Sequence, residues 1–153
     1  LAKSRARAAG LMQIMPATAS FVTKNRTYRG RGRHLLLNPQ RNLEIGQAYI
    51  NKLLNEPLID GSIVRLLAAY NGGPGNLRKW LARVDHQDDP FLLIESIPAR
   101  ETRHYIKSVI SNLALYRRQL GEPAPELREL AAGGPGRFVS LNLPTMVSSD
   151  DGS

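Results

Sequence analysis

Apolar residues recur at helical spacing along most of the chain, and no segment of the first 120 residues alternates as a half-buried strand does. The segment 63–68 is hydrophobic nearly all round, which is typical of a buried helix. In the preceding helical segment the apolar positions recur near a period of 3.6 residues, at Leu43, Ala48, Tyr49, Leu53 and Leu54. The pattern therefore predicts an all-α fold.

Proline, asparagine and glycine mark the ends of the expected helices. Pro16 suits a first helical turn, because its missing N–H has no partner there, and a short helix should follow over 17–24. Asn38 is expected to cap the second helix, and Gly72 and Gly73 to end a third that starts at 60–62. Further helices are expected from Pro74, over 91–95 and over 100–120, the last with an apolar face of Tyr105, Ile106, Val109, Ile110, Leu113 and Tyr116. The arginine- and glycine-rich segment 25–34 is expected to be a loop.

The composition changes after residue 120. Residues 121–153 are rich in prolines and small residues and end in several serines, a composition that seldom forms an apolar core. We therefore expect an irregular tail or linker there. Residues 138–143 could form a short strand, but the sequence predicts no second strand with which it could pair. The expected organisation is a helical domain over 1–120, followed by an irregular tail over 121–153.

Charge is unevenly distributed. The formal net charge is +8, with five acidic and two basic residues (net −3) in 121–153 and +11 in the residues before them. The positive charge of residues 1–120 favours an anionic partner, such as a cell-wall polymer, a nucleic acid or a lipid surface. An ordinary solvated surface rich in arginine explains this charge as well. The segment 26–33 would be the footprint of a basic nucleic-acid binder, but that interpretation leaves Gln13, Tyr70 and Asn71 unexplained, so we expect no nucleic-acid partner.

Several classes of site and segment are excluded by residue content. The absence of cysteine excludes disulfides and thiolate sites, and three scattered histidines, His34, His86 and His104, lack metal-ligand spacing. We therefore expect no metal and no cofactor. No run approaches the roughly 18 apolar residues of a membrane span, and no secretory signal follows Leu1, so the sequence is interpreted as a mature product or a fragment.

Two short motifs have the residue types of a saccharide site. The first is GLMQIMPATA at 10–19, and the second is AAYNGGPG at 68–75. Gly10 permits a close approach of the backbone, and Gln13 can both donate to and accept from sugar hydroxyls. Tyr70 offers a ring for stacking and a hydroxyl for hydrogen bonding.

Four blocks in this order resemble the lytic transglycosylases of the soluble type, lysozyme-like enzymes that cut bacterial peptidoglycan. They are 10–19 preceded by Ser4, 38–46, 68–75, and 94–103 (IESIPARETR) followed by Tyr105 and Tyr116. Each block is weak alone, whereas four at matching spacing are specific. The resemblance covers roughly residues 1–117 and implies a goose-lysozyme-like helical fold. It also implies that the domain over 1–120 lacks the first helix of that fold.

The resemblance also implies a set of substrate-binding residues: Ser4, Gln13, Met15, Tyr70, Asn71, Glu95 and Tyr116. Each has a plainer alternative. Gln13 could make only a loop hydrogen bond, Met15, Tyr70 and Tyr116 could fill the core, Asn71 could cap its helix, and Glu95 could be a surface carboxylate. Glu101, in a first helical turn, is interpreted as structural, with Arg103 as a possible local partner.

Enzymes of this family are understood to use a single glutamate. It protonates the glycosidic oxygen leaving N-acetylmuramic acid and then takes the proton of that sugar's C6 hydroxyl, which attacks C1 to give a 1,6-anhydro end without consuming water. The resemblance places this glutamate about six residues before Leu1, and the first acidic residue of the chain is Glu44. The chain as given is therefore expected to be inactive by itself.

Three explanations for the missing glutamate are open. The favoured one is a lytic transglycosylase of which this chain is a part. The alternative is a binder of peptidoglycan that does not cleave it, and the least favoured makes Glu44 or Glu95 the acid. The resemblance further implies glycan strands of peptidoglycan as partner, an exported protein in the periplasm or cell envelope, and a monomer.

Overall fold

The computed structural model describes residues 8–83 and 89–138. Within these ranges the chain is helical and contains no strand, only two isolated β-bridges, so the predicted all-α fold is confirmed. No helix of the described ranges is both long and apolar enough to cross a membrane. The elements are α1 (Pro16–Thr23), η1 (Arg26–Arg29), η2 (Arg31–Leu37), α2 (Pro39–Leu54), α3 (Ile63–Gly72), α4 (Pro74–Arg83), α5 (Pro90–Ser96), α6 (Arg100–Gln119) and α7 (Pro125–Ala131).

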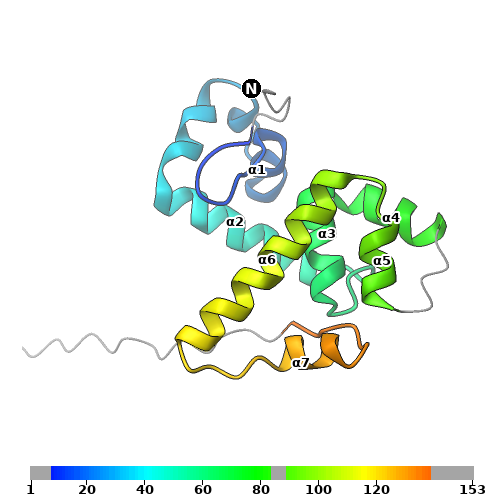
Figure 1. Ribbon diagram of the computed structural model, residues 1–153. Coiled ribbons are helices and arrows are strands. Elements are labelled where there is room, and N and C mark those ends of the chain that lie inside the picture. The colour runs from blue at the N-terminus through cyan, green and yellow to red at the C-terminus, as the bar shows by residue number, and fades with distance from the viewer. Residues whose placement is uncertain (1–7, 84–88, 139–153) are drawn as a thin grey trace, which may run out of the picture.

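The helices gather around two apolar clusters. The smaller cluster lies among α1, the 3-10 helices and the start of α2, and includes Ile14, Tyr28 and Leu36. The larger surrounds the buried helix α3 and draws on α2, α4, α5, α6 and α7. Figure 1 shows α1 and α2 on one side and α3, α4 and α5 on the other, with the long helix α6 running obliquely between. Val22 and Tyr70 pack against both clusters and so connect them.

Polar caps and prolines fix where the helices begin, as the sequence predicts. Asn38 Oδ1 accepts the N–H of Arg41 (2.9 Å) at the start of α2. Asp89 Oδ1 accepts the N–H groups of Phe91 and Leu92 (2.7 and 3.1 Å) at the start of α5. Each cap satisfies N–H groups that have no partner within the helix.

The expected loop over 25–34 is wrong, because this segment forms the 3-10 helices η1 and η2. Asn25 Oδ1 caps η1 through the N–H of Thr27 (2.9 Å), and Gly32 lies so close to Thr27 that a Cβ would be 2.9 Å from its methyl carbon. Tyr28 and Leu36 anchor the two helices in the smaller cluster. A 3-10 helix has three residues per turn, so the 3.6-residue period gives no signal for this segment.

The expected apolar face of α2 is correct for Tyr49 and Leu53 and wrong for Leu43, which is 47% exposed, and for the exposed Ala48. The fully buried position of that turn is a polar one, Asn42. The side-chain amide of Asn42 forms hydrogen bonds with backbone groups about 30 residues away in the sequence. These bonds offset the cost of burying a polar side chain, and a hydrophobicity pattern cannot predict them.

The expected irregular tail is wrong for 125–131, which form α7. Glu126 on this helix is fully buried and accepts from Arg117 Nε on α6 (2.8 Å), and Leu130 enters the larger cluster. Beyond α7 the chain returns to α3, where the N–H of Ile63 donates to the carbonyl of Gly136 (3.0 Å). Figure 1 shows α7 beneath α6. Residues 121–138 are thus packed onto the body, and the rest of the expected strand, 139–143, lies outside the described residues.

Candidate functional site

A groove of about 390 Å³ opens where the turn at 10–15 faces the end of α3 and the start of α6. It combines apolar and aromatic side chains with amide and carboxyl groups, the mixture typical of a saccharide site. The groove is lined by Ala8, Leu11, Met12, Gln13, Met15, Tyr70, Asn71, Glu101 and Tyr105. Both motifs singled out in the sequence therefore meet at one place.

The first wall is a tight turn closed by its own backbone. Ala9 and Ile14 exchange hydrogen bonds in both directions (3.1 and 2.9 Å), and the N–H of Gln13 donates to the carbonyl of Gly10 (3.1 Å). Gly10 has a φ of +73°, and a Cβ there would lie 2.3 Å from Asn42 Nδ2. The close approach expected of Gly10 is therefore present, and its partner is the buried side chain of Asn42.

Asn42 holds this turn in place. Its Oδ1 accepts the N–H of Met12 (2.7 Å), and its Nδ2 donates to the carbonyls of Ala9 and Leu36 (both 2.9 Å). One buried amide thus ties the turn and the end of η2 to α2, and the groove wall is preorganised by α2.

Tyr70 forms the second wall. Its hydroxyl donates to the carbonyl of Met12 (2.8 Å), and its ring is stacked on that of Tyr105, with centroids 6.4 Å apart and planes 6° apart. Burial, with the neighbouring Tyr105 and Tyr49, raises the pKa of the Tyr70 hydroxyl, so the group stays protonated and continues to donate at neutral pH. Tyr70 is only half-buried, so its ring lines the groove while its hydroxyl holds the opposite wall.

Asn71 lies in the last turn of α3 but does not cap it, since Gly73 occupies the C-cap and its N–H donates to the carbonyl of Ala69. Asn71 Oδ1 instead accepts from Thr102 Oγ1 on α6 (2.7 Å). This bond joins α3 to the first turn of α6 beside the groove that Asn71 lines.

Glu101 and Tyr105 line the groove although the sequence analysis did not assign them to it. Glu101 lies in the first turn of α6, as expected, but the Arg103 guanidinium donates to the carbonyl of Ile97. The signal that could have found them is their spacing: residues four apart share one face of a helix, and Tyr105 stacks on Tyr70.

Gln13 and Met15, two of the expected site residues, line the groove. Gln13 is exposed and its Nε2 donates to the carbonyl of Gly10 (2.9 Å), so the loop hydrogen bond considered as an alternative is made as well. Met15 is the N-cap residue of α1 and 37% exposed, so it is not a core side chain.

Glu95 and Tyr116 do not line this groove, and Ser4 lies outside the described residues. The exposed Glu95 forms an ion pair with Lys107, whose hydrogen bond lowers the pKa of the Glu95 carboxyl. Tyr116 is 64% exposed and does not belong to the apolar face of α6. It lies near the C-terminal end of this helix, four turns from Glu101.

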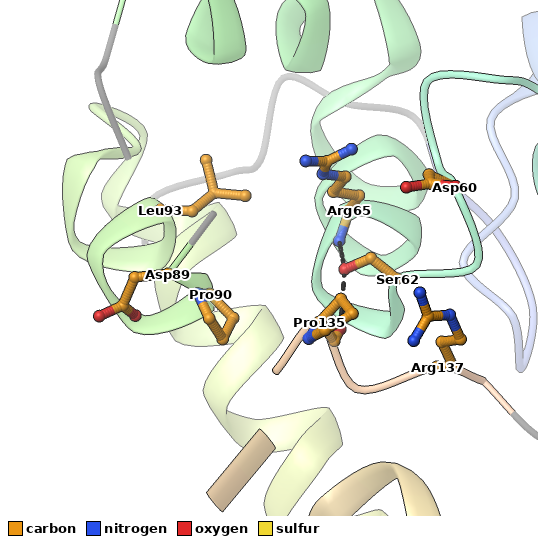
Figure 2. A pocket seen from close by; sticks show the side chains of 8 residues that line it. All are labelled: Asp60, Ser62, Arg65, Asp89, Pro90, Leu93, Pro135 and Arg137. Carbon is orange, nitrogen blue, oxygen red and sulfur yellow. Dashed lines mark hydrogen bonds between the residues drawn. The ribbon is translucent and has the colours of Figure 1, made fainter. Parts of the chain in front are cut away.

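A different hollow of about 220 Å³ lies where the C-terminal segment meets α3 and α5. Figure 2 shows the polar groups around it, most of which already have structural partners. Ser62 Oγ accepts from the N–H of Arg65 (3.4 Å) and donates to the carbonyl of Pro135 (3.0 Å). Arg137 pairs with Glu129, and Asp89 caps α5. We attribute this hollow to the packing of the C-terminal segment.

Comparison with known proteins shows the family to which the chain belongs. Residues 1–91, more than half of the chain, match the family described as "Transglycosylase SLT domain". The chain belongs to the SLT transglycosylase family. The matched range contains both groove motifs and Asn42, whereas Glu101 and Tyr105 lie beyond it.

Individual relatives support the SLT assignment. The chain is 40% identical over 123 residues to a "Soluble lytic murein transglycosylase" of Salmonella typhimurium, and 38% identical to the protein of that name from Escherichia coli K12. In both cases the match covers 78% of this chain and 18% of the relative, so the chain spans less than a fifth of their length.

A solved structure shows the same fold. It is an inactive mutant of the lytic transglycosylase Slt from Pseudomonas aeruginosa, matched with a TM-score of 0.66 and 32% identity. The match covers 90% of this chain and 20% of that chain. The lysozyme-like SLT fold expected from the sequence is thereby confirmed.

Among the described residues, no group of three or more His, Asp or Glu side chains is arranged to hold a metal ion.

Proposed function

We propose that this SLT domain binds glycan strands of peptidoglycan in the groove between the turn at 10–15 and Tyr70, as part of a lytic transglycosylase. The observation that carries the proposal is the convergence of both motifs on one groove, with Tyr70 bonded directly to Met12. The relatives' names and the SLT match support the same reaction class.

In this proposal the groove residues bind the sugar through two kinds of contact. Met15 and the stacked pair of Tyr70 and Tyr105 offer apolar surface to the sugar faces. Gln13 and Asn71 offer amide groups to hydroxyl and N-acetyl groups. Glu95 and Tyr116 stay predictions from the family resemblance, and so does Ser4.

The proposed reaction cleaves the β-1,4 bond between N-acetylmuramic acid and N-acetylglucosamine. The catalytic carboxylic acid protonates the leaving O4, and the resulting carboxylate takes the proton of the C6 hydroxyl as its oxygen bonds to C1. One bond is broken and one is formed, so water is not consumed and a 1,6-anhydro end results. An acid of this kind needs a raised pKa, for which Leu11, Met15 and Tyr70 provide an apolar surrounding.

We propose that a glutamate N-terminal to Leu1 supplies this proton, as the family resemblance implies. Among the described residues that line the groove, Glu101 carries the only carboxyl group. Glu44, on the exposed side of α2, instead accepts from Gln40 (3.1 Å), and Glu95 pairs with Lys107. Neither Glu44 nor Glu95 lines the groove, which argues against either as a substitute acid.

Cleavage is tested by incubating purified peptidoglycan with residues 1–153 and, separately, with the longest protein that the gene encodes. We expect mass spectrometry to find 1,6-anhydromuropeptides with the longer protein and little or none with residues 1–153. New reducing ends in place of anhydro ends would contradict the reaction. Binding by the longer protein without any cleavage would favour the alternative of a binder that does not cut.

We further propose that the protein acts in the cell envelope, in the periplasm where one is present, because that is where its proposed substrate lies. That the protein is a monomer stays a prediction from the family resemblance.

A further inference from the structure

A second hollow continues the groove on the side of the 3-10 helix η2. It has a volume of about 470 Å³ and shares Ala8 and Gln13 with the groove. Its other side chains include Arg33, His34 and Leu37, all on η2. A ligand that leaves the groove past Gln13 therefore meets η2 next.

The chain around this hollow carries a one-sided charge. Residues 8–43 contain six lysines or arginines and no aspartate or glutamate. The ion pairs that the described part of the chain forms lie elsewhere, at Lys107–Glu95, Arg117–Glu126 and Arg137–Glu129. Arg33 is thus exposed beside a groove with no carboxylate of its own segment to neutralise it.

The hollow is held in a defined shape. Nδ1 of His34 donates to the carbonyl of Arg31 (2.8 Å), which fixes the imidazole on η2. The N–H of Arg33 donates to the carbonyl of Gly30 (3.2 Å), and the end of η2 is tied to the groove wall through Asn42 and the carbonyl of Leu36. The position of Arg33 relative to the groove is therefore set by the same buried amide that sets the turn.

We propose that Arg33, with His34 beside it, is a subsite for carboxylate groups carried by the peptide stems of the bound glycan. This inference rests on the proposed function, because peptidoglycan is a saccharide that carries peptide carboxylates along its strand. A guanidinium binds a carboxylate through two parallel hydrogen bonds. The neutral sugar occupies the groove, and the anionic branch reaches the hollow at η2.

The test measures binding by residues 1–153 to three soluble probes. The first is a glycan–peptide oligomer with free peptide carboxylates, the second is the same oligomer with those carboxylates converted to amides, and the third is the neutral hexamer of N-acetylglucosamine. The variant is Arg33→Gln, and the matched control is Arg26→Gln, which removes the same charge from η1, away from the hollow.

We expect Arg33→Gln to weaken binding of the carboxylate probe about fivefold, which is the upper end of the range for an exposed ion pair. Binding of the amidated and neutral probes should be unchanged. Arg26→Gln should leave the binding of all three probes unchanged. Added salt should weaken binding of the carboxylate probe more in the unmodified protein than in Arg33→Gln.

Three results would overturn the inference. Equal losses with Arg33→Gln and Arg26→Gln would indicate diffuse attraction to a basic surface. Equal losses on all three probes would assign Arg33 to the fold or to sugar contact. Tight binding of the neutral hexamer without any preference for free carboxylates would refute the subsite and leave the proposed function standing, whereas no binding of any probe would refute both.

Discussion

The hydroxyl of Tyr70 donates a hydrogen bond to the backbone carbonyl of Met12, 58 residues earlier in the chain, at 2.8 Å. This bond crosses the groove floor between the two motifs that the sequence analysis treated separately. It also fixes the Tyr70 ring against Tyr105 and Tyr49. The two walls of the groove, the turn at 10–15 and Tyr70, are therefore parts of one hydrogen-bonded unit.

Replacing Tyr70 with phenylalanine should lower the free energy of unfolding by about 1 kcal/mol, because a partly buried carbonyl loses its donor. Glycan binding should weaken as well, since the turn at 10–15 loses one of its supports. Denaturant unfolding and binding of the N-acetylglucosamine hexamer measure the two effects. The control Tyr116→Phe, at a 64% exposed position, should leave the free energy of unfolding unchanged, and an unchanged Tyr70→Phe would show that the bond is not maintained in solution.

Stability should fall in alkaline solution. Burial raises the pKa of the Tyr49, Tyr70 and Tyr105 hydroxyls above the value of 10.0 that applies to the unfolded chain. Above that pH the unfolded state loses protons that the folded state retains, so the free energy of unfolding decreases as pH rises, by up to about 1.4 kcal/mol per pH unit for each tyrosine. Below pH 10 this contribution is fully present.

Denaturant unfolding between pH 8 and 11.5 measures this dependence, with tyrosinate absorbance recorded in parallel. The variant Tyr70→Phe should show a shallower decline than the unmodified chain, because it lacks one of the three groups. A free energy of unfolding that stays constant up to pH 11.5 would mean that these hydroxyls titrate normally.

Gly10→Ala should be severely destabilising. A Cβ at this position would lie 2.3 Å from Asn42 Nδ2 and 2.5 Å from the carbonyl oxygen of Leu36, and the residue has a φ of +73°. Left-handed backbone costs a non-glycine residue about 1 kcal/mol or more, and overpacking adds about 1–3 kcal/mol.

The matched control for Gly10→Ala is Gly75→Ala. Gly75 lies in α4, where a Cβ meets nothing within 4 Å, and a helical glycine replaced by alanine gains up to about 1 kcal/mol. Thermal unfolding compares the two variants. Equal melting temperatures would contradict the close packing of the turn against Asn42.

The ion pair between Arg117 and Glu126 should couple α7 to the body. Glu126→Ala alone should cost about 3–5 kcal/mol, because it leaves the buried Arg117 guanidinium without that carboxylate. The double variant Arg117→Met, Glu126→Leu should have a free energy of unfolding close to that of the unmodified chain, since two apolar side chains suit the same buried position. A double variant as unstable as Glu126→Ala would show that the charge pair itself is required.

The sequence was informative wherever a local signal existed. Pro16, Asn38 and Pro74 marked helix starts because these signals depend on neighbouring residues only. The two motifs identified the groove through Gln13, Met15, Tyr70 and Asn71.

Three of the errors share a physical cause, since each concerns a contact made across the chain. Asn42 is polar yet fully buried, because its partners at Ala9, Met12 and Leu36 are brought to it only by the fold. Glu126 lies in a segment with the composition of a tail, and only its ion pair with Arg117 explains its burial. Glu101 was assigned to its helix alone because the groove it faces is completed by another part of the chain.

The central claim is that glycan binds in the groove between Met12, Met15 and Tyr70. The most direct measurement is an NMR titration of residues 1–153, labelled at the methionine methyl groups, with the N-acetylglucosamine hexamer. The account predicts saturable shifts of the Met12 and Met15 methyl resonances that are reduced or lost in Tyr70→Ala and retained in Phe91→Ala, a variant at a 53% exposed position outside the groove. Saturable binding of the hexamer without any shift of Met12 or Met15 would place the saccharide elsewhere and contradict the account.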